Sequence, residues 1–334
     1  MTHQNQHQEV AQKLIATYQG PEPLAAFLKK YFAANKKHGS KDRKSISAFC
    51  YAYFRDMYAN FPLQECISKE IDIPTFIHSH TIQPLLFIRI RPWQKEKVVA
   101  ALHAASIEYT QVHEHCFAFS NTTALQNVLA LNKEAVIQDL NSQALADLLQ
   151  FVPTSMETPI QVWDACAASG GKTILMFDTM QNIRMHVSDV RESILFNADK
   201  RLQEAGIRPA SVQVIDLTEP FDIKKPFDFV FADLPCSGSG TWGRTPEQIA
   251  FFTEENLDHY TALQSKIIAN ILPTVKLNGH LLLATCSVYE AENEAHVQAI
   301  LSQGQFELVE QKYFIGYTQQ ADTLFGAILK RHSV

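Results

Sequence analysis

Between residues 160 and 287 the chain repeats a short apolar segment followed by a longer amphipathic one. The apolar segments predict strands and read IQVWDAC, RMHVSDV, SVQVID, FDFVFADLP and GHLLLATCS. The amphipathic segments predict helices and include GKTILMFDTMQ, RESILFNADKRLQEAG and EENLDHYTALQSKIIANILPTVK. This alternation predicts an α/β fold, in which helices cover both faces of a parallel sheet. The tail, FELVEQKYF and TLFGAILKR, predicts a closing antiparallel hairpin.

Two further domains are expected before this part of the chain. Residues 1–80 carry apolar side chains at three- and four-residue spacing, which predicts a helical region. Over residues 81–132, PLLFIRI, QKEKVVAALHAAS, IEYTQVHEHCFAFS and NTTALQNVLAL predict a strand, a helix, a strand and a helix. AVIQDLNSQALADLLQFV predicts a helix that leads into the third domain, residues 133–334.

The composition is that of a folded soluble protein. The chain has 334 residues, of which 46% are hydrophobic, enough for two or three domains. The start, MTHQNQHQEVAQK, lacks the apolar region of a signal peptide, and no apolar run has the length of a membrane span. We therefore expect a cytoplasmic protein without a membrane partner. Its six cysteines lack the spacing of a disulfide framework and are expected to stay reduced.

The charge is distributed unevenly along the chain. The net charge of −6 does not by itself indicate a nucleic-acid partner. Residues 29–55, however, contain eight lysines and arginines against one acid, Asp42, with tyrosines and phenylalanines interleaved. Two interpretations stay open: a solvated helix face, or a surface that binds a polyanion such as RNA. Under the second interpretation, the candidate RNA-binding residues are Lys36, Lys37, Lys41 and Lys44.

The segment HEHC places His113, His115 and Cys116 close together, which could suggest a metal site. In a strand, alternation would put both histidines on one face and the cysteine on the other. One ion could not easily collect all three side chains, so we expect no metal.

The first predicted strand of the repeat ends in DACAASGGKT, a loop of small residues that opens a helix. It is not a phosphate-binding P-loop, because that motif needs glycine where Cys166 stands. Such a loop lets backbone N–H groups approach a ligand closely. Asp189, Asp216 and Asp233 then fall at the ends of the next three strands. One such aspartate is often a helix cap, but three favour a nucleoside cofactor, with Asp189 on the ribose and Asp216 on the adenine.

The sequence of this loop also indicates which nucleoside cofactor is bound. S-adenosylmethionine fits better than NAD, because the loop lacks the pattern G-x-G-x-x-G.

DACAASGGKT, ADLPCSGSG and ATCSVYEAENE, in this order, resemble the RNA 5-methylcytosine methyltransferases of the Sun/nucleolar-protein type. The resemblance is strong from about Ala135 onward. It implies a Rossmann-like S-adenosylmethionine-dependent methyltransferase domain, preceded by a small RRM-like α/β unit and a helical N-terminal region. It also implies that the loop holds the cofactor through Ala167, Ala168, Ser169, Gly170, Gly171 and Lys172.

The family usually has proline where this chain has Ser169, a difference that is expected to change loop stiffness and cofactor affinity. Asp233 is implied to lie beside the methionine end of the cofactor and the target cytosine.

Cys236 and Cys286 each follow a predicted strand and precede a serine. A thiolate that adds to cytosine C6 makes C5 nucleophilic, and a second thiol could help to release the product. The residues alone do not choose between the two cysteines. The resemblance implies that Cys286 attacks, that Cys236 helps release, and that Asp233 stabilises the adduct at N3. The alternative is that both thiols are structural, as we expect for Cys50, Cys66 and Cys116.

The predicted function is therefore methylation of cytosine C5 in rRNA or tRNA by a monomer. A methyltransferase for another base atom or for protein is disfavoured, because DLPCSG lacks the second proline and the aromatic residue typical of exocyclic-amine enzymes. An RNA-binding assembly factor without activity is disfavoured because both cysteines are present.

Overall fold

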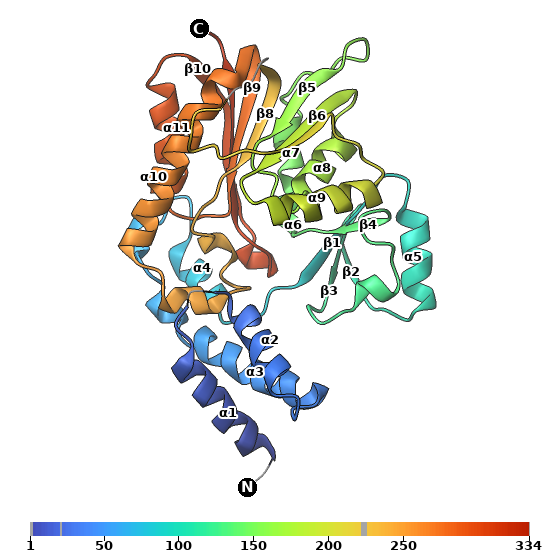
Figure 1. Cartoon of the computed structure of the whole chain (residues 1–334), viewed down its shortest axis with the longest axis vertical. Coiled ribbons are helices and arrows are strands. Elements are labelled where there is room, and N and C mark those ends of the chain that lie inside the picture. The colour runs from blue at the N-terminus through green and yellow to red at the C-terminus, as the bar shows by residue number, and fades with distance from the viewer. Residues whose placement is uncertain (1–2, 21, 222–225, 334) are drawn as a thin grey trace.

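The computed structural model describes residues 3–20, 22–221 and 226–333. In this part of the chain a seven-stranded sheet has the order β10-β11-β9-β8-β5-β6-β7 (Figure 1). Its strands are β5 (Ile160–Asp164), β6 (Ile183–Asp189), β7 (Ser211–Val214), β8 (Phe227–Asp233), β9 (Val275–Thr285), β10 (Phe306–Phe314) and β11 (Leu324–Arg331). The strands β5 to β9 pair in parallel, whereas β10 and β11 form an antiparallel hairpin against β9. The predicted α/β fold and its closing hairpin are confirmed.

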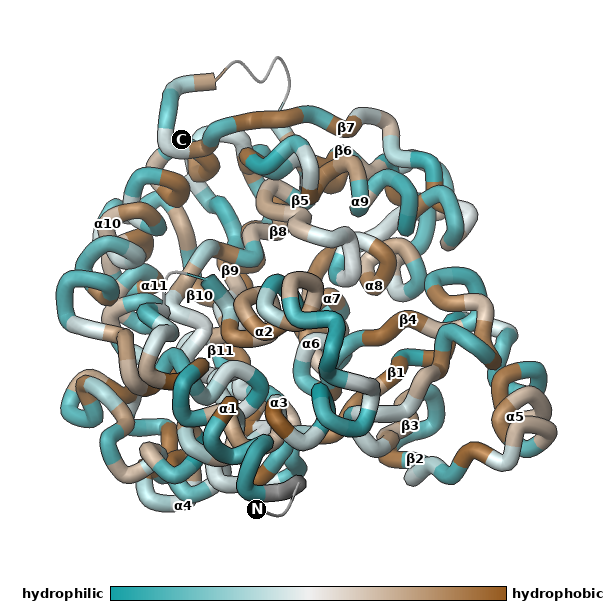
Figure 2. The backbone as a smooth tube through the Cα atoms, turned by 60° about the horizontal axis from the view of Figure 1, so that its bottom comes forward, coloured by the Kyte–Doolittle hydropathy of each residue, from teal (hydrophilic) through white to brown (hydrophobic). Residues whose placement is uncertain are grey.

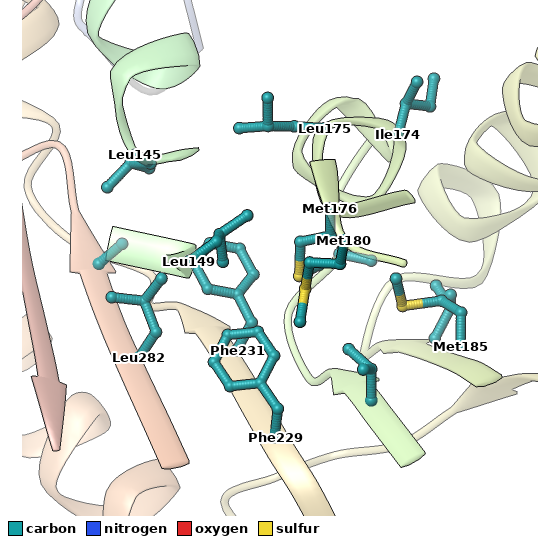
Figure 3. Packing of buried hydrophobic residues seen from close by; sticks show 14 of the residues in the cluster. Leu145, Leu149, Ile174, Leu175, Met176, Met180, Met185, Phe229, Phe231 and Leu282 are labelled. Carbon is teal, nitrogen blue, oxygen red and sulfur yellow. The ribbon is translucent and has the colours of Figure 1, made fainter. Parts of the chain in front are cut away.

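Helices cover both faces of this sheet, because the central strands are apolar on both sides. In β8, Phe229 and Phe231 face a core formed with α8 (Gly171–Thr179) and α9 (Glu192–Glu204). Figure 3 shows the two rings packed against methionines and leucines of that core. Val230 and Ala232 face the opposite core, formed with α10 (Glu254–Ile271) and α11 (Glu294–Leu301). Figure 2 shows teal and brown turns along α10, as expected for a helix with one buried face.

A second, four-stranded antiparallel sheet has the order β2-β3-β1-β4. It contains β1 (Leu86–Ile90), β2 (Thr110–His113), β3 (Cys116–Phe119) and β4 (Ala135–Ile137), with α5 (Lys95–Ala104) between β1 and β2. Two arginines tie this sheet to α8: the buried Arg89 and the half-buried Arg91, directly after β1, each lie 2.7 Å from a carboxylate oxygen of Asp178.

Three details of the predicted secondary structure are wrong. The stretch 107–120 is a hairpin rather than one strand, so His113 and Cys116 flank a turn and strand alternation does not apply across them. The stretch 121–131 contains one short 3-10 helix, Leu125–Asn127, where a full helix was predicted. No cluster of three or more His, Cys, Asp or Glu side chains in the described ranges could hold a metal ion.

The third wrong detail concerns the start of the predicted lead-in helix. Residues Ala135–Ile137 form β4 and pair with β1, because a short apolar run can complete a sheet as readily as begin a helix. The helix begins later, where the Asp139 side chain accepts a hydrogen bond from the N–H of Asn141, and it is split into α6 (Leu140–Ala144) and α7 (Ala146–Leu149). The small sheet thus extends past the boundary predicted at residue 132.

The N-terminal region consists of α1 (His3–Thr17), α2 (Leu24–Ala34), α3 (Ser40–Arg55) and α4 (Ile73–Ser79). The first three of these helices share a core that includes Leu28, Ile46 and Phe54. This core reaches the loop that follows β8, where the Glu247 side chain accepts a 2.9 Å hydrogen bond from the N–H of Leu24. None of the helices in the described residues has both the length and the apolar composition of a membrane span.

The predicted basic surface is wrong in one part, because the structure places Arg55 away from it. Its guanidinium is buried and donates hydrogen bonds to the carbonyls of His80 at 3.0 Å and Gly243 at 2.8 Å. Arg55 therefore anchors the N-terminal helices to the loop after β8 and does not belong to a polyanion-binding surface.

Candidate active site

The two cysteines singled out in the sequence meet at the carboxyl edge of the large sheet. Strands β8 and β9 are parallel neighbours, with Asp233 opposite Ala284, so the segments that follow them leave the sheet at the same edge. Cys236 lies three residues beyond β8, and Cys286 directly follows β9. Their Sγ atoms are 3.5 Å apart, and both side chains are half-buried.

Gly240 joins the segment after Cys236 to the Cys286 loop. Its N–H donates a 2.8 Å hydrogen bond to the carbonyl of Cys286, and its own carbonyl accepts one from Thr323 at 2.9 Å. A Cβ atom at this position would lie 2.0 Å from the carbonyl oxygen of Thr323. Only glycine allows this close approach, which places β11 behind the two cysteine loops.

An ion pair lies beside the thiols. The Nζ of Lys172 is 2.7 Å from Oδ2 of Asp233, and both side chains are mostly covered. Burial acts to lower the pKa of Lys172, but the charge and hydrogen bond of Asp233 outweigh burial and raise this pKa above its ordinary value. Lys172 is therefore an ammonium ion at neutral pH, and it also faces Cys286.

The glycine-rich loop is shaped by two left-handed residues, Ala168 at φ 47° and Gly170 at φ 78°. These conformations turn the chain sharply from β5 into α8, which begins at Gly171. The carbonyl and the Oγ of Ser169 each accept a 2.8 Å hydrogen bond from Arg201 on α9. Arg201 thus restrains the loop at the position where a proline was expected.

The carboxylate of Asp189 is already fully engaged. It accepts a 2.9 Å hydrogen bond from the N–H of Ala168 and hydrogen bonds from the backbone and guanidinium of Arg191. Burial opposes ionisation, but these hydrogen bonds prevail and lower the pKa of Asp189 below its ordinary value. Asp216 is exposed, and the side chain and N–H of Thr218 lower its pKa by donating to it.

Three residues near the candidate site were not predicted as site residues. Asp164 ends β5, is fully buried and accepts a 2.5 Å hydrogen bond from Thr173. Burial raises the pKa of Asp164 to about 7, and its Oδ1 has no partner within the described residues. The other two residues are Arg191 and Glu292. Arg191 donates a hydrogen bond to Asp189, and Glu292 accepts one from Ser237, next to Cys236. Asp164 and Glu292 lie inside the motifs DACAASGGKT and ATCSVYEAENE, and Arg191 lies two residues after Asp189, so position in the sequence was the signal that could have found them.

A cleft of about 370 Å³ opens between the glycine-rich loop and the small sheet. The loop, Lys172 and Asp233 line this cleft, and so do Arg244, Asp139 and Asp322. Arg244 lies 2.6 Å from Asp139 and 2.8 Å from Asp322, so it joins the start of α6 to the hairpin β10–β11.

The four lysines predicted to bind RNA are exposed on the α2–α3 connection and the first turns of α3. A groove of about 510 Å³ lies beside them, between α2 and α3. Lys29, Arg43 and Lys44 line this groove together with Phe32 and Tyr51. Of the four predicted lysines, Lys44 lines this groove, whereas Arg55 is buried and is not among the lining residues.

The family described as 16S rRNA methyltransferase RsmB/F matches residues 149–326, which is more than half of the chain. The chain belongs to this family. The resemblance seen in the three motifs is thereby confirmed, and the cofactor of RsmB/F methyltransferases is S-adenosylmethionine. The matched residues contain the glycine-rich loop, both cysteines and Asp233.

Two relatives of the RsmB/F chain illustrate the extent of the similarity. This chain is 31% identical over 177 residues to the ribosomal RNA small subunit methyltransferase B of Yersinia enterocolitica. The alignment covers 52% of this chain and 40% of that protein. It is 33% identical over 167 residues to the protein of the same name from Serratia proteamaculans, covering 49% and 38%. The match thus spans about two fifths of the length of these relatives.

Solved structures share the fold of the RsmB/F chain at low sequence identity. PH0851 has a TM-score of 0.74 at 20% identity and covers 95% of this chain and 80% of its own. NSun6 from Pyrococcus horikoshii, determined with SFG, has a TM-score of 0.69 at 13% identity and covers 84% of this chain and 98% of its own. These similarities confirm the predicted Rossmann-like methyltransferase fold.

Proposed function

We propose that this protein methylates C5 of cytosine in rRNA or tRNA through a covalent bond between Cys286 and cytosine C6. The observation that carries the proposal is the 3.5 Å distance between the Cys286 and Cys236 sulfurs, beside the Asp233–Lys172 pair. One thiol suffices for nucleophilic attack. A second thiol in contact with it fits a reaction in which a covalent bond must also be broken.

The proposed chemistry assigns each group one step. The Cys286 thiolate adds to C6, and the electron pair of the C5–C6 bond becomes available at C5. S-adenosylmethionine, when bound, supplies the electrophilic methyl group. C5 then carries both a methyl group and a proton. With Cys286 bound to C6 and no longer charged, Cys236 releases its own proton to solvent, and its thiolate accepts the C5 proton. The electrons of the C5–H bond restore the double bond and expel the Cys286 thiolate.

Asp233 is proposed to stabilise the adduct at cytosine N3. A carboxylate would have to receive or share a proton there, and Lys172 is the nearest proton donor, 2.7 Å from Asp233. The pair can therefore supply a proton while the ring holds negative charge and recover it when the thiolate leaves.

The glycine-rich loop fits the cofactor. Its small residues Ala167, Ala168, Ser169 and Gly171 line the cleft together with the cationic side chains of Lys172 and Arg201. We propose that Ala167, Ala168, Ser169, Gly170, Gly171 and Lys172 hold the methionine end and the ribose. Asp216 offers an exposed carboxylate oxygen to the adenine amino group. Asp189 fits the ribose hydroxyls only if Arg191 gives up its hydrogen bonds.

We also propose that Lys36, Lys37, Lys41 and Lys44 contact RNA phosphates, since all four are exposed and Lys44 lines the α2–α3 groove. The division into a helical region, an RRM-like unit and a methyltransferase domain is kept as part of the proposal. Its second boundary is placed after β4, because β4 pairs with β1.

The test compares alanine variants of the two cysteines, with Cys66→Ala as a control for loss of a half-buried thiol outside the two cysteine loops. Cys286→Ala should bind cofactor and RNA but should neither methylate nor crosslink. Cys236→Ala should form the adduct and release it slowly, so a covalent protein–RNA complex should accumulate and survive denaturing electrophoresis. The Cys66→Ala variant should methylate RNA without accumulating a covalent protein–RNA complex.

The asymmetry between the variants decides the assignment, because general destabilisation would impair both steps without trapping an intermediate. A complex trapped in Cys286→Ala would assign attack to Cys236. Retained activity in both variants, with no complex, would show that the two thiols are structural.

A further inference from the structure

Glu292 is a buried carboxylate that contacts both cysteine loops. It ends the short 3-10 helix Glu290–Glu292 and is 1% exposed. Its Oε1 accepts a 2.7 Å hydrogen bond from the N–H of Ser237, and its Oε2 accepts hydrogen bonds from the hydroxyls of Ser237, at 2.6 Å, and Ser287. Ser237 directly follows Cys236, and Ser287 directly follows Cys286. One side chain therefore sets the relative position of the two thiol-bearing segments.

The hydrogen bonds around Glu292 favour its charged form. Its neighbours present donors: one backbone N–H, two hydroxyls and, at 3.5 Å, the Nε2 of Gln264. Burial raises the pKa of Glu292, and the hydrogen bonds from both serines act against this increase. A carboxylate can accept all these hydrogen bonds at once, whereas the protonated acid would lose an acceptor site.

The charges that surround the thiol pair are arranged asymmetrically. Lys172, paired with Asp233, interacts electrostatically with Cys286, whereas Glu292 interacts electrostatically with Cys236. The pKa of Cys236 is raised well above its ordinary value by its hydrogen bond to Cys286, then by burial, and further by negative charge at Cys286 and Glu292. The remaining titratable groups near Glu292 are Tyr260, Tyr289 and, through Gln264, His296.

None of these three groups supplies a compensating positive charge near neutral pH. Burial raises the pKa of both tyrosines and lowers the pKa of His296, so all three are neutral. The Glu292 charge therefore acts on the thiols without a cationic partner among the groups that face it from α10, α11 and the Cys286 loop.

We propose that Glu292 is a positioning residue that assigns the two cysteines their roles. Its negative charge, held against the backbone and hydroxyl of Ser237, keeps Cys236 as a thiol. The S–H of Cys236 then donates to Cys286, and Cys286 carries the thiolate that attacks. This inference rests on the proposed function and extends it, since it explains why the residue nearer Lys172 is the nucleophile.

The experiment measures alkylation of each cysteine by iodoacetamide as a function of pH, without RNA, with peptide mass spectrometry to separate the two sites. Glu292→Gln removes the charge at nearly constant shape. Glu290→Gln is the matched control, because Glu290 lies on the same short helix but is exposed. In the unmodified protein and in the control, Cys286 should react faster than Cys236.

In Glu292→Gln the preference for Cys286 should fall about tenfold, because one pKa unit changes the thiolate fraction tenfold well below the pKa. The pH at which Cys236 becomes reactive should fall as well. If Glu292→Gln has a native circular dichroism spectrum but an unchanged preference and pH profile, Glu292 only stabilises the fold. An equally large change of the preference in Glu290→Gln would lead to the same conclusion. Faster reaction at Cys236 in the unmodified protein would also overturn the proposal.

If Glu292→Gln does not fold, Glu292→Asp serves as the second variant. It keeps the charge but withdraws the carboxylate from Ser237, so the preference should fall about threefold, less than full neutralisation would give. A preference that does not change in Glu292→Asp would overturn the inference. The trapping experiment with RNA tests the proposed function separately, so the two proposals can fail independently.

Discussion

Replacing Arg244 by methionine should destabilise the protein in a pH-dependent way. Arg244 lies between two buried carboxylates, with Nη2 2.6 Å from Asp139 and Nε 2.8 Å from Asp322. It also donates to the carbonyl of Leu85 at 3.0 Å. Methionine keeps much of the aliphatic volume but leaves Asp139 and Asp322 facing each other, with Lys172 as the remaining cation that acts on Asp322.

The magnitude follows from the burial of this triad. Removing one partner of a buried ion pair typically costs about 3–5 kcal/mol. The Arg244 side chain is 31% exposed, while those of Asp139 and Asp322 are 8% and 11% exposed, so the lower end applies. We expect a loss of about 3 kcal/mol near pH 8. For a chain of this size this corresponds to a decrease in Tm of about 4 °C.

The pH dependence follows from Asp322. Burial, together with the charge of Asp139, raises the pKa of Asp322 to about 7 from an ordinary value of 3.8. Between these values the folded protein binds a proton that the unfolded chain has released, so this group's contribution to stability falls as the pH rises through that window. Near pH 5.5 Asp322 is protonated and neutral, so its burial no longer requires an ion pair with Arg244. The Arg244→Met loss should therefore shrink to about half of its value near pH 8.

Thermal unfolding followed by circular dichroism, at about pH 5.5 and about pH 8, measures both effects. Arg184→Met on β6 is the control, because Arg184 is exposed. A loss below about 1 kcal/mol, or an equal loss at both pH values, would refute the electrostatic role assigned to Arg244.

Three further predictions concern ligand binding and loop geometry. Asp189→Ala should weaken cofactor binding at least tenfold by calorimetry, because it removes hydrogen bonds to a charged group, and Asp216→Ala should weaken it less; unchanged affinity in both variants would contradict the cofactor assignment. Gly240→Ala should abolish methylation and lower Tm, since its Cβ would lie 2.0 Å from a carbonyl oxygen, and a normal turnover number would contradict this account. RNA binding should weaken, with a shallower dependence on salt concentration, when glutamate replaces Lys36, Lys37, Lys41 and Lys44.

The sequence alone was sufficient for the parts of the fold that depend on local periodicity. The apolar segments from Ile160 to Thr285 contain strands in the structure, because short apolar runs between helices favour a sheet that is covered on both faces. The edge strand β7 is largely exposed. The acids at the strand ends and the glycine-rich loop could be located for the same reason. Short segments could not be assigned, since Ala135–Ile137 is compatible with either a helix or a strand until β1 lies beside it.

Spatial relations between distant segments were decided by the tertiary structure. No periodicity in the sequence states that β8 lies next to β9, yet this pairing brings the sulfurs of Cys236 and Cys286 to 3.5 Å across fifty residues of chain. The burial of Arg55 at the end of the basic stretch depends on its distant contact with Gly243, and the coverage of Asp189 by Arg191 depends on a loop contact. The sequence determined which chemical groups are available and which strands carry them. The packing of parallel strands determined which groups meet, because neighbouring strands deliver their carboxyl ends to one edge.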